Sequence, residues 1–139
     1  MEYIDSYRKA FIYIKSDYVM SALHGNTLRR YIIDYFKDRS IRFTFWLRLS
    51  SHKKGLLYPL CKFMWKRYSI KYCLEIRPET LIGKGFRLIH GLCVVINKNS
   101  QIGENVRIFQ FTTIGEKNGN SPIIKNGVTI YANSTILGG

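Results

Sequence analysis

These 139 residues lack the sequence features of a membrane-spanning, secreted or disulfide-rich protein. No run of about 18 uncharged apolar residues occurs, and the charged N-terminus lacks the apolar core of a signal peptide. The three cysteines show neither a C-x-x-C motif nor a paired spacing, which argues against a disulfide framework and a zinc site. We therefore expect a cytoplasmic protein that holds no metal.

Acidic residues are also scarce. The chain has 22 Lys and Arg against 9 Asp and Glu, and residues 1–73 carry 15 of the basic side chains but only 5 of the acidic ones. Such a basic surface attracts nucleic acid, anionic lipid or an anionic substrate, or is simply solvated. Because no nucleic-acid-binding motif accompanies it, we expect no nucleic-acid partner.

Residues 1–73 are predicted to be helical. Apolar residues at helical spacing indicate two short helices between Ser16 and Asp38, with a start signal at Ser16–Asp17 and a break at Gly25–Asn26. A third helix is expected around 43–51 and a fourth over 56–70, "LLYPLCKFMWKRYSI", with Pro59 in its first turn.

The fourth predicted helix mixes Leu, Phe, Met and Trp with Lys and Arg, which is typical of an amphipathic helix at a membrane surface. Such a helix could make peripheral contact with an anionic membrane. The alternative, which we favour, is that its apolar face packs on the rest of the protein.

A different pattern begins after Cys73. Aliphatic residues recur every six positions, with one two-residue slip and one longer interruption. They are Ile76, Ile82, Leu88, Val94, Ile96, Ile102, Ile108, Ile114, Ile124, Ile130 and Ile136. Neither the helical period of 3.6 nor strand alternation explains a period of six, which is the mark of a hexapeptide β-helix.

Two further columns agree with this interpretation. Three residues after the aliphatic position come residues that tolerate positive φ, which predicts corners at Gly85, Gly91, Asn99, Asn105, Gly127 and Asn133. Four residues after it come mostly small or β-branched residues suited to a narrow interior, namely Thr80, Leu92, Ser100, Val106, Thr112, Val128 and Ser134. Phe86 is the bulky exception. Three strands and three corners would give one coil of about 18 residues.

The phrases "EIRPETLIGKGFRLIHG", "VVINKNSQIGENVRIFQFTTIG" and "SPIIKNGVTIYANSTILGG" resemble the hexapeptide-repeat acyltransferases, and most closely their serine acetyltransferase and polysaccharide O-acetyltransferase branch. The resemblance implies a mainly β fold, in which a basic α-helical segment (1–73) precedes a left-handed parallel β-helix (74–139). It also implies an acetyl-CoA-dependent O-acetyltransferase that works as a homotrimer.

The resemblance assigns His90 as the general base and Glu75, fifteen residues upstream, as its acidic partner. An imidazole that is mostly neutral at pH 7 suits the removal of a hydroxyl proton. Because fifteen residues are close to one coil, we expect the two side chains to be neighbours. Cys93 could act as a nucleophile, but family members transfer acetyl directly and a packed thiol is the expected role.

The resemblance also places coenzyme A in a groove between adjacent β-helices of a trimer. The matching positions here are Gly115, Glu116, Lys117, Ala132 and Asn133. Backbone N–H groups along this edge would bind the pantetheine and polarise the thioester oxygen. The serine enzymes carry two consecutive glycines where this chain has Gly115 and Glu116, a difference that would narrow the groove.

The acceptor-binding positions implied by the resemblance are Ile89, Asn120 and Ser121, where the serine enzymes have charged groups. None of the three supplies the charge that a zwitterionic amino acid needs. We therefore expect a neutral acceptor, a sugar hydroxyl of a surface polysaccharide precursor at the inner membrane face, with L-serine, as in cysteine biosynthesis, as the alternative.

The hexapeptide frame reaches Gly139, whereas family members continue for several more coils. We expect the chain to lack these C-terminal coils, so that a trimer partner or another segment covers the open end. A non-catalytic, truncated assembly module is a further alternative.

Overall fold

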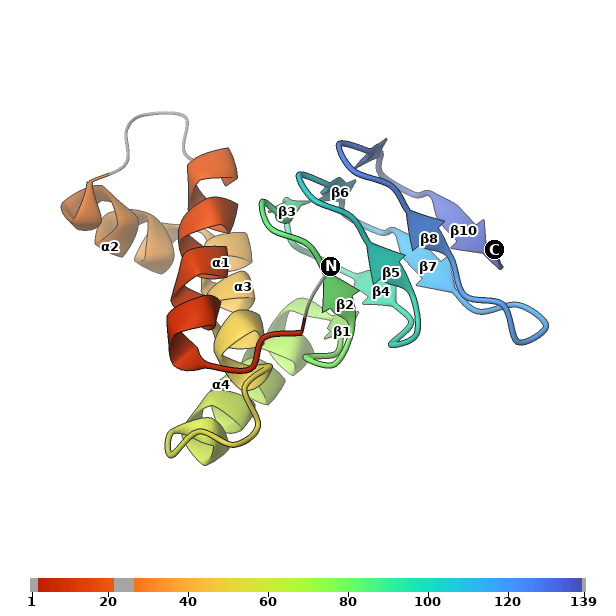
Figure 1. Ribbon diagram of the computed structural model, residues 1–139. Helices are drawn as coiled ribbons and strands as arrows, with labels where there is room; N and C mark the ends of the chain where they lie inside the picture. Colours follow the sequence, from red (N-terminus) through yellow and green to blue (C-terminus); the bar gives the residue numbers. More distant parts are fainter. Residues whose placement is uncertain (1–2, 22–26, 139) are drawn as a thin grey trace.

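The computed structural model describes residues 3–21 and 27–138, with four helices followed by ten short parallel strands (Figure 1). The helices are α1 (Tyr7–Ser21), α2 (Leu28–Lys37), α3 (Arg39–Ser50) and α4 (Tyr58–Tyr72). The strands are β1 (Leu74–Ile76), β2 (Leu81–Ile82), β3 (Arg87–Ile89), β4 (Val94–Ile96), β5 (Gln101–Ile102), β6 (Arg107–Phe109), β7 (Thr113–Gly115), β8 (Ile123–Ile124), β9 (Thr129–Ile130) and β10 (Thr135–Leu137).

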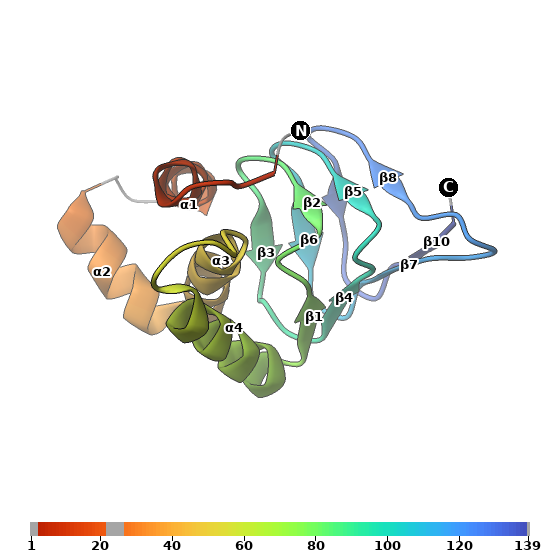
Figure 2. The same cartoon turned by 60° about the horizontal axis from the view of Figure 1, so that its bottom comes forward.

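The strands stack into three parallel sheets, ordered β1-β4-β7-β10, β2-β5-β8 and β3-β6-β9. Successive strands of the chain therefore lie in different sheets, and each sheet forms one wall of a β-helix of about three turns (Figure 2). The predicted mainly β fold with a helical segment before it is confirmed. Coil length varies, however: Ile82 pairs with Ile102, Ile96 with Ile114 and Ile102 with Ile124, which are separations of 20, 18 and 22 residues.

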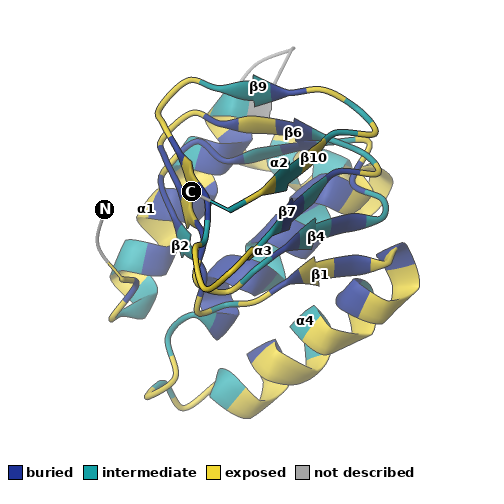
Figure 3. Cartoon of the chain, turned by 90° about the vertical axis from the view of Figure 1, so that its right-hand side faces the viewer, coloured by how far each residue is buried: buried dark blue, intermediate teal, exposed yellow. Residues whose placement is uncertain are grey.

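The period-six aliphatic residues fill the inside of the β-helix. Ten of the eleven are buried, from Ile76 to Ile130, and Ile136 in the last coil is partly buried. Phe86 is also buried inside the first coil, at 1% exposed, so the bulky exception fits there. Figure 3 shows dark blue buried residues and yellow exposed residues along the same coils.

Positive φ marks only some of the predicted corners. Gly85, Asn105, Gly127 and Asn133 have φ between 56° and 72°, as expected, but Gly91 and Asn99 do not have positive φ. The corner at 97–100 is instead a tight turn in which Ser100 N donates to Asn97 O at 3.1 Å. Near Gly91 the positive φ falls on the flanking residues His90 (60°) and Cys93 (50°).

Gly91 is required for a different reason. A Cβ built there would lie 2.5 Å from Oγ of Ser40, which lies in the first turn of α3. The missing side chain therefore lets the first coil approach the helix closely.

Two predicted helix starts are wrong. α1 begins at Tyr7, so Ser16 and Asp17 lie inside it instead of starting it. α3 begins at Arg39, four residues before the predicted start, because the Asp38 carboxylate caps it by accepting from Ser40 N at 2.7 Å. Pro59 lies in the first turn of α4, as predicted. The predicted break at Gly25–Asn26 lies outside the described residues.

A buried ion pair joins the helices to the first coil. Arg48 of α3 donates to both oxygens of Asp17 of α1 at 2.8 and 3.2 Å, and each side chain is 4% exposed. Its guanidinium also donates to the carbonyls of Ile82 and Gly83, while Asp17 accepts from Phe86 N. Arg48 and Asp17 together thus form a charged link between the helices and the first coil.

The hydrophobic core crosses from the helices into the β-helix. Phe43 and Leu47 of α3 and Tyr72 of α4 belong to the same buried cluster as the stacked aliphatic residues. The chain passes from α4 to β1 at Cys73, which has φ 52°. The division into segments 1–73 and 74–139 stays a prediction.

Candidate functional site

His90 stands at the corner that follows β3, where the chain turns from one sheet to the next. It has a φ of 60° and is exposed. The prediction that this histidine projects from the β-helix agrees with that position. Ile89, immediately before it, is the last residue of β3 and is half-buried.

An aromatic row that the sequence analysis missed lies beside His90. The imidazole meets the Phe109 ring edge-on with centroids 6.4 Å apart, and Phe109 stacks on Tyr131 at 5.3 Å. Phe109 lies opposite Ile89 in the strand register, one coil further on. The three rings come from three successive coils. A sequence search could have found them only as aromatic residues spaced by one coil length, and that length is known only from the strand register.

Glu75 lies in the middle of β1, exposed and directly opposite Val95 of β4. The interpretation of fifteen residues as nearly one coil is therefore wrong, because the first coil contains 20 residues. His90 lies at the beginning of the corner that leads into β4, while Glu75 lies on the sheet beyond that corner. Within residues 3–21 and 27–138, no hydrogen bond or ion pair joins the two side chains.

The predicted coenzyme and acceptor residues fall into two groups on different edges of the β-helix. Gly115, Glu116 and Lys117 lie at the corner after β7, together with Asn120 and Ser121. The other group, Ile89, Ala132 and Asn133, lies on the edge of His90. One sheet, β1-β4-β7-β10, separates the two edges, so a single chain does not bring the groups together.

The corner after β7 is a structured polar loop. Lys117 and Asn120 exchange backbone hydrogen bonds of 3.0 Å around Asn118–Gly119, both at positive φ, as in a tight hairpin turn. The Glu116 carboxylate accepts from Asn99 Nδ2 and Ser121 Oγ, each at 3.2 Å. The Glu116 and Ser121 side chains therefore hold the loop in place in this structure.

A groove of about 310 Å³ connects Glu75 with one of the predicted coenzyme contacts. It runs over the outer face of β1, β4 and β7, and its lining includes Glu75, Arg77, Lys98 and Gly115. Both signs of charge therefore face the same small space. Arg77 and Lys98 were not singled out from the sequence, because their common orientation depends on the stacking of two coils.

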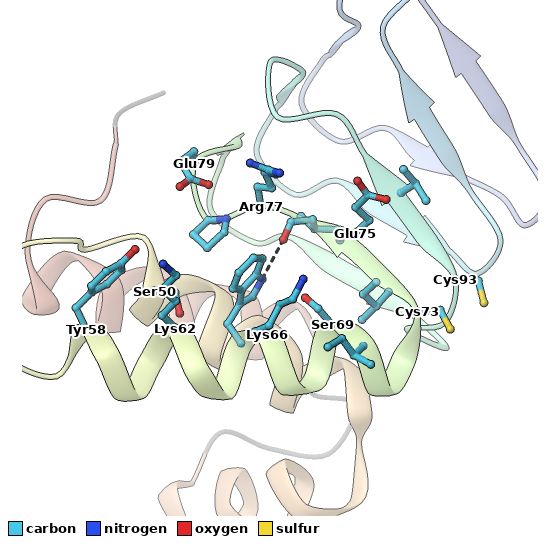
Figure 4. A pocket seen from close by; sticks show the side chains of 16 residues that line it. Ser50, Tyr58, Lys62, Lys66, Ser69, Cys73, Glu75, Arg77, Glu79 and Cys93 are labelled. Carbon is cyan, nitrogen blue, oxygen red and sulfur yellow. Dashed lines mark hydrogen bonds between the residues drawn. The ribbon is translucent and has the colours of Figure 1, made fainter.

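A larger groove of about 850 Å³ separates α4 from the first coil (Figure 4). Lys62 and Lys66 of α4 line one wall, and Glu75, Arg77 and Glu79 line the other. Trp65 lies between them, and its Nε1 donates to Ile76 O at 3.0 Å. The tryptophan of the predicted amphipathic helix therefore packs on the β-helix, which agrees with the favoured alternative for this helix.

Cys93 lies at the end of this groove next to Cys73, and the structure records both as free thiols. Partial burial and the neighbouring Cys73 thiol raise the pKa of Cys93, so it is mostly protonated at neutral pH. That state does not suit the nucleophile of a two-step transfer.

Within the described residues, no three His, Cys, Asp or Glu side chains gather as a metal site would need, and no helix is long and apolar enough to cross a bilayer.

The chain is similar in sequence to serine acetyltransferases. The enzyme of Staphylococcus epidermidis is 36% identical over 99 residues, covering 67% of this chain and 46% of the relative, and that of Bacillus subtilis is 39% identical over 69 residues, covering 47% and 32%. The chain is a serine acetyltransferase-like hexapeptide-repeat protein. It spans less than half the length of these curated relatives, and no protein-family model matches it.

Solved structures show the same fold for this serine acetyltransferase-like chain. The serine acetyltransferase of Neisseria gonorrhoeae in complex with serine superposes with a TM-score of 0.74 at 23% identity, covering 94% of this chain and 56% of that one. Isoform 3 from Entamoeba histolytica, in complex with cysteine, gives 0.74 at 21% identity, covering 95% and 49%. The likeness includes the helices as well as the coils.

Proposed function

We propose that the chain transfers acetyl from acetyl-CoA to a hydroxyl group, with His90 as the general base. The observation that carries the proposal is the exposed His90 at the corner after β3, in a β-helix whose sequence relatives are serine acetyltransferases. Its imidazole stands clear of the packed interior and can reach a bound substrate.

The proposed reaction is direct. A ring nitrogen of His90 takes the proton of the acceptor hydroxyl as that oxygen attacks the thioester carbonyl carbon. The carbon–sulfur bond then breaks, and the imidazolium returns the proton to the leaving coenzyme A thiolate. Backbone N–H groups near Gly115 and Asn133 are the proposed donors to the developing oxyanion.

The two edges suggest how the site is completed. We propose that copies of the chain associate as a trimer, so that the His90 edge of one copy faces the Gly115 edge of its neighbour. Acetyl-CoA would lie between them, against Glu116, Lys117 and Ala132. Glu75 lies on the sheet between the two edges. It would orient His90 only if a rearrangement of its side chain, or contact with a neighbouring copy, brought a carboxylate next to the imidazole.

This assembly is testable by dilution. If the sites are shared between copies, the specific activity should fall at the protein concentrations at which the trimer dissociates into monomers. Analytical ultracentrifugation measures that dissociation. Monomers that keep the full specific activity would show that one chain suffices.

L-Serine is the acceptor that the comparisons favour, which reverses the order expected from the sequence. The small groove supplies a physical basis, because Glu75 could meet the ammonium group of a zwitterion while Arg77 or Lys98 meets its carboxylate. These charges replace those missing at Ile89, Asn120 and Ser121.

A sugar hydroxyl is the second candidate acceptor, and the aromatic row favours it. Phe109 and Tyr131 present stacked rings next to His90, and Tyr131 is 68% exposed. Beside half-buried Ile89 they offer an apolar surface on which a neutral ring could rest. In this case the product would enter surface polysaccharide synthesis.

The two acceptors are separated by measuring thiol release from acetyl-CoA with L-serine and with a panel of sugars, and by identifying the product by mass spectrometry. The serine proposal predicts O-acetylserine and a loss of activity in the double variant Arg77→Met with Lys98→Met. Activity with a sugar alone, lost in Tyr131→Ala, would favour the second candidate. If none of the acceptors gave thiol release, the non-catalytic assembly module would be favoured.

Peripheral contact with an anionic membrane from the cytoplasmic side is a further proposal. Leu60, Phe63 and Ile70 of α4 are 52%, 64% and 68% exposed, next to Lys62, Lys66 and Arg67. Trp65 does not take part, because it packs on the β-helix. Flotation with anionic vesicles should carry the chain upward; no flotation would remove the proposal.

A further inference from the structure

Cys73 and Cys93 are brought together by the register of the first two coils. Leu74 pairs with Val94, so the residues before them occupy equivalent corner positions one coil apart. Neighbouring parallel strands lie about 4.8 Å apart, within the Cα separations of about 4.4–6.8 Å that disulfides span. The backbone is tied here as well, since Cys93 N donates to Tyr72 O at 3.1 Å.

The two side chains also point the same way. Cys73 has φ 52° and Cys93 has φ 50°, so each leaves the backbone in the same left-handed conformation. Figure 4 shows both sulfur atoms at the same end of the groove. Cys73 is exposed and Cys93 is partly buried, and the nearby Cys73 thiol helps to raise the pKa of Cys93.

We propose that Cys73 and Cys93 form a redox-sensitive dithiol that low-molecular-weight disulfides such as glutathione disulfide convert into an intramolecular disulfide. The bond would close the 20-residue first coil, including His90, into a covalent ring. This proposal does not depend on acetyltransferase activity.

The exchange balances in two steps. The exposed Cys73 thiolate attacks a sulfur of glutathione disulfide, forming a mixed disulfide and releasing one glutathione thiolate. Cys93 then loses its proton to solvent and attacks the Cys73 sulfur, which releases the second glutathione. Together the two thiols lose two protons and two electrons, and glutathione disulfide accepts the electrons.

The third cysteine provides an internal control. Cys61 lies in α4 with 1% exposure, inside a separate apolar cluster with Ala10 and Leu49, and burial raises the pKa of its thiol. It should therefore stay reduced under conditions that oxidise the pair.

The test equilibrates the full chain with reduced and oxidised glutathione, blocks remaining thiols with N-ethylmaleimide, and maps disulfides by mass spectrometry of non-reducing digests. We expect a linked Cys73–Cys93 peptide pair, with Cys61 carrying the maleimide. Cys61→Ser should still form the link, whereas Cys73→Ser and Cys93→Ser should form none. Separate glutathione adducts, or thiols that stay free, in the wild-type chain would overturn the proposal.

A second measurement tests whether the bond fits the fold. Closing a coil without strain should raise the Tm of the oxidised wild-type chain by about 5–10 °C, with no rise in Cys73→Ser. An unchanged or lower Tm despite a mapped link would contradict the ring closure inferred from the register. Disulfide mapping and the Tm do not require turnover, so both tests remain valid even if the chain has no activity.

Discussion

The helical part and the β-helix are held together in different ways. In the β-helix each aliphatic residue rests on its counterpart one coil away, as Leu88 and Ile108 do, so one rule repeats through the stack. The helices also pack on apolar clusters, but their position is fixed in addition by polar contacts that occur once, such as the Arg48–Asp17 pair and the Asp38 cap. The β-helix therefore relies on many similar contacts, whereas the helical part includes polar contacts that have no counterpart elsewhere in the stack.

The largest expected effect comes from breaking the ion pair that joins the two regions. Arg48→Met should cost about 3–5 kcal/mol of unfolding free energy, because the buried Asp17 carboxylate loses its guanidinium. The carbonyls of Ile82 and Gly83 lose donors at the same time. Chemical denaturation measures the change, with exposed Arg107→Met as the matched control. Equal losses in the two variants would show that the link is not a concentrated source of stability.

A smaller loss is expected from one rung of the β-helix. Ile108 is fully buried, so Ile108→Ala should cost about 2–5 kcal/mol through lost burial and the cavity left behind. Ile123 lies on an outward position and is 54% exposed, so Ile123→Ala should cost well under half as much. The same denaturation experiment compares the pair, and similar losses would contradict the inward and outward assignment.

The smallest effect concerns the caps of the helices. Asp38→Ala should cost about 1 kcal/mol, because Ser40 N loses its acceptor at the start of the buried helix α3. Thr27→Ala should cost less, since Thr27 caps the exposed helix α2 through a longer bond of 3.3 Å to Arg30 N. A larger loss from Thr27→Ala would reverse the ranking.

The same contrast explains which features could be predicted from the sequence. The buried aliphatic column was predictable, because its period of six survives small changes in coil length. The start of α1 was not, because Ser16–Asp17 looks like a helix start, whereas Asp17 is the partner of Arg48. A single polar contact leaves no periodic signal.

Site geometry was harder to predict, because it depends on the register between coils. The Glu75–His90 spacing suggested neighbours, but the first coil has 20 residues, so Glu75 lies opposite Val95. The same 20-residue register brings Cys73 beside Cys93, although no short motif connects them. The separation of the two predicted groups of coenzyme contacts likewise became visible only once the strands were assigned to sheets.

The most direct test of the central claim is the rate of thiol release from acetyl-CoA with L-serine in the wild-type chain and in His90→Ala. Gln110→Ala is the matched control, because Gln110 occupies the equivalent corner position one coil further on. If His90 is the general base, its variant should lose about 10²–10⁴-fold in rate while keeping the wild-type Tm, and Gln110→Ala should lose far less. A His90→Ala chain that turns over at the wild-type rate would contradict the account.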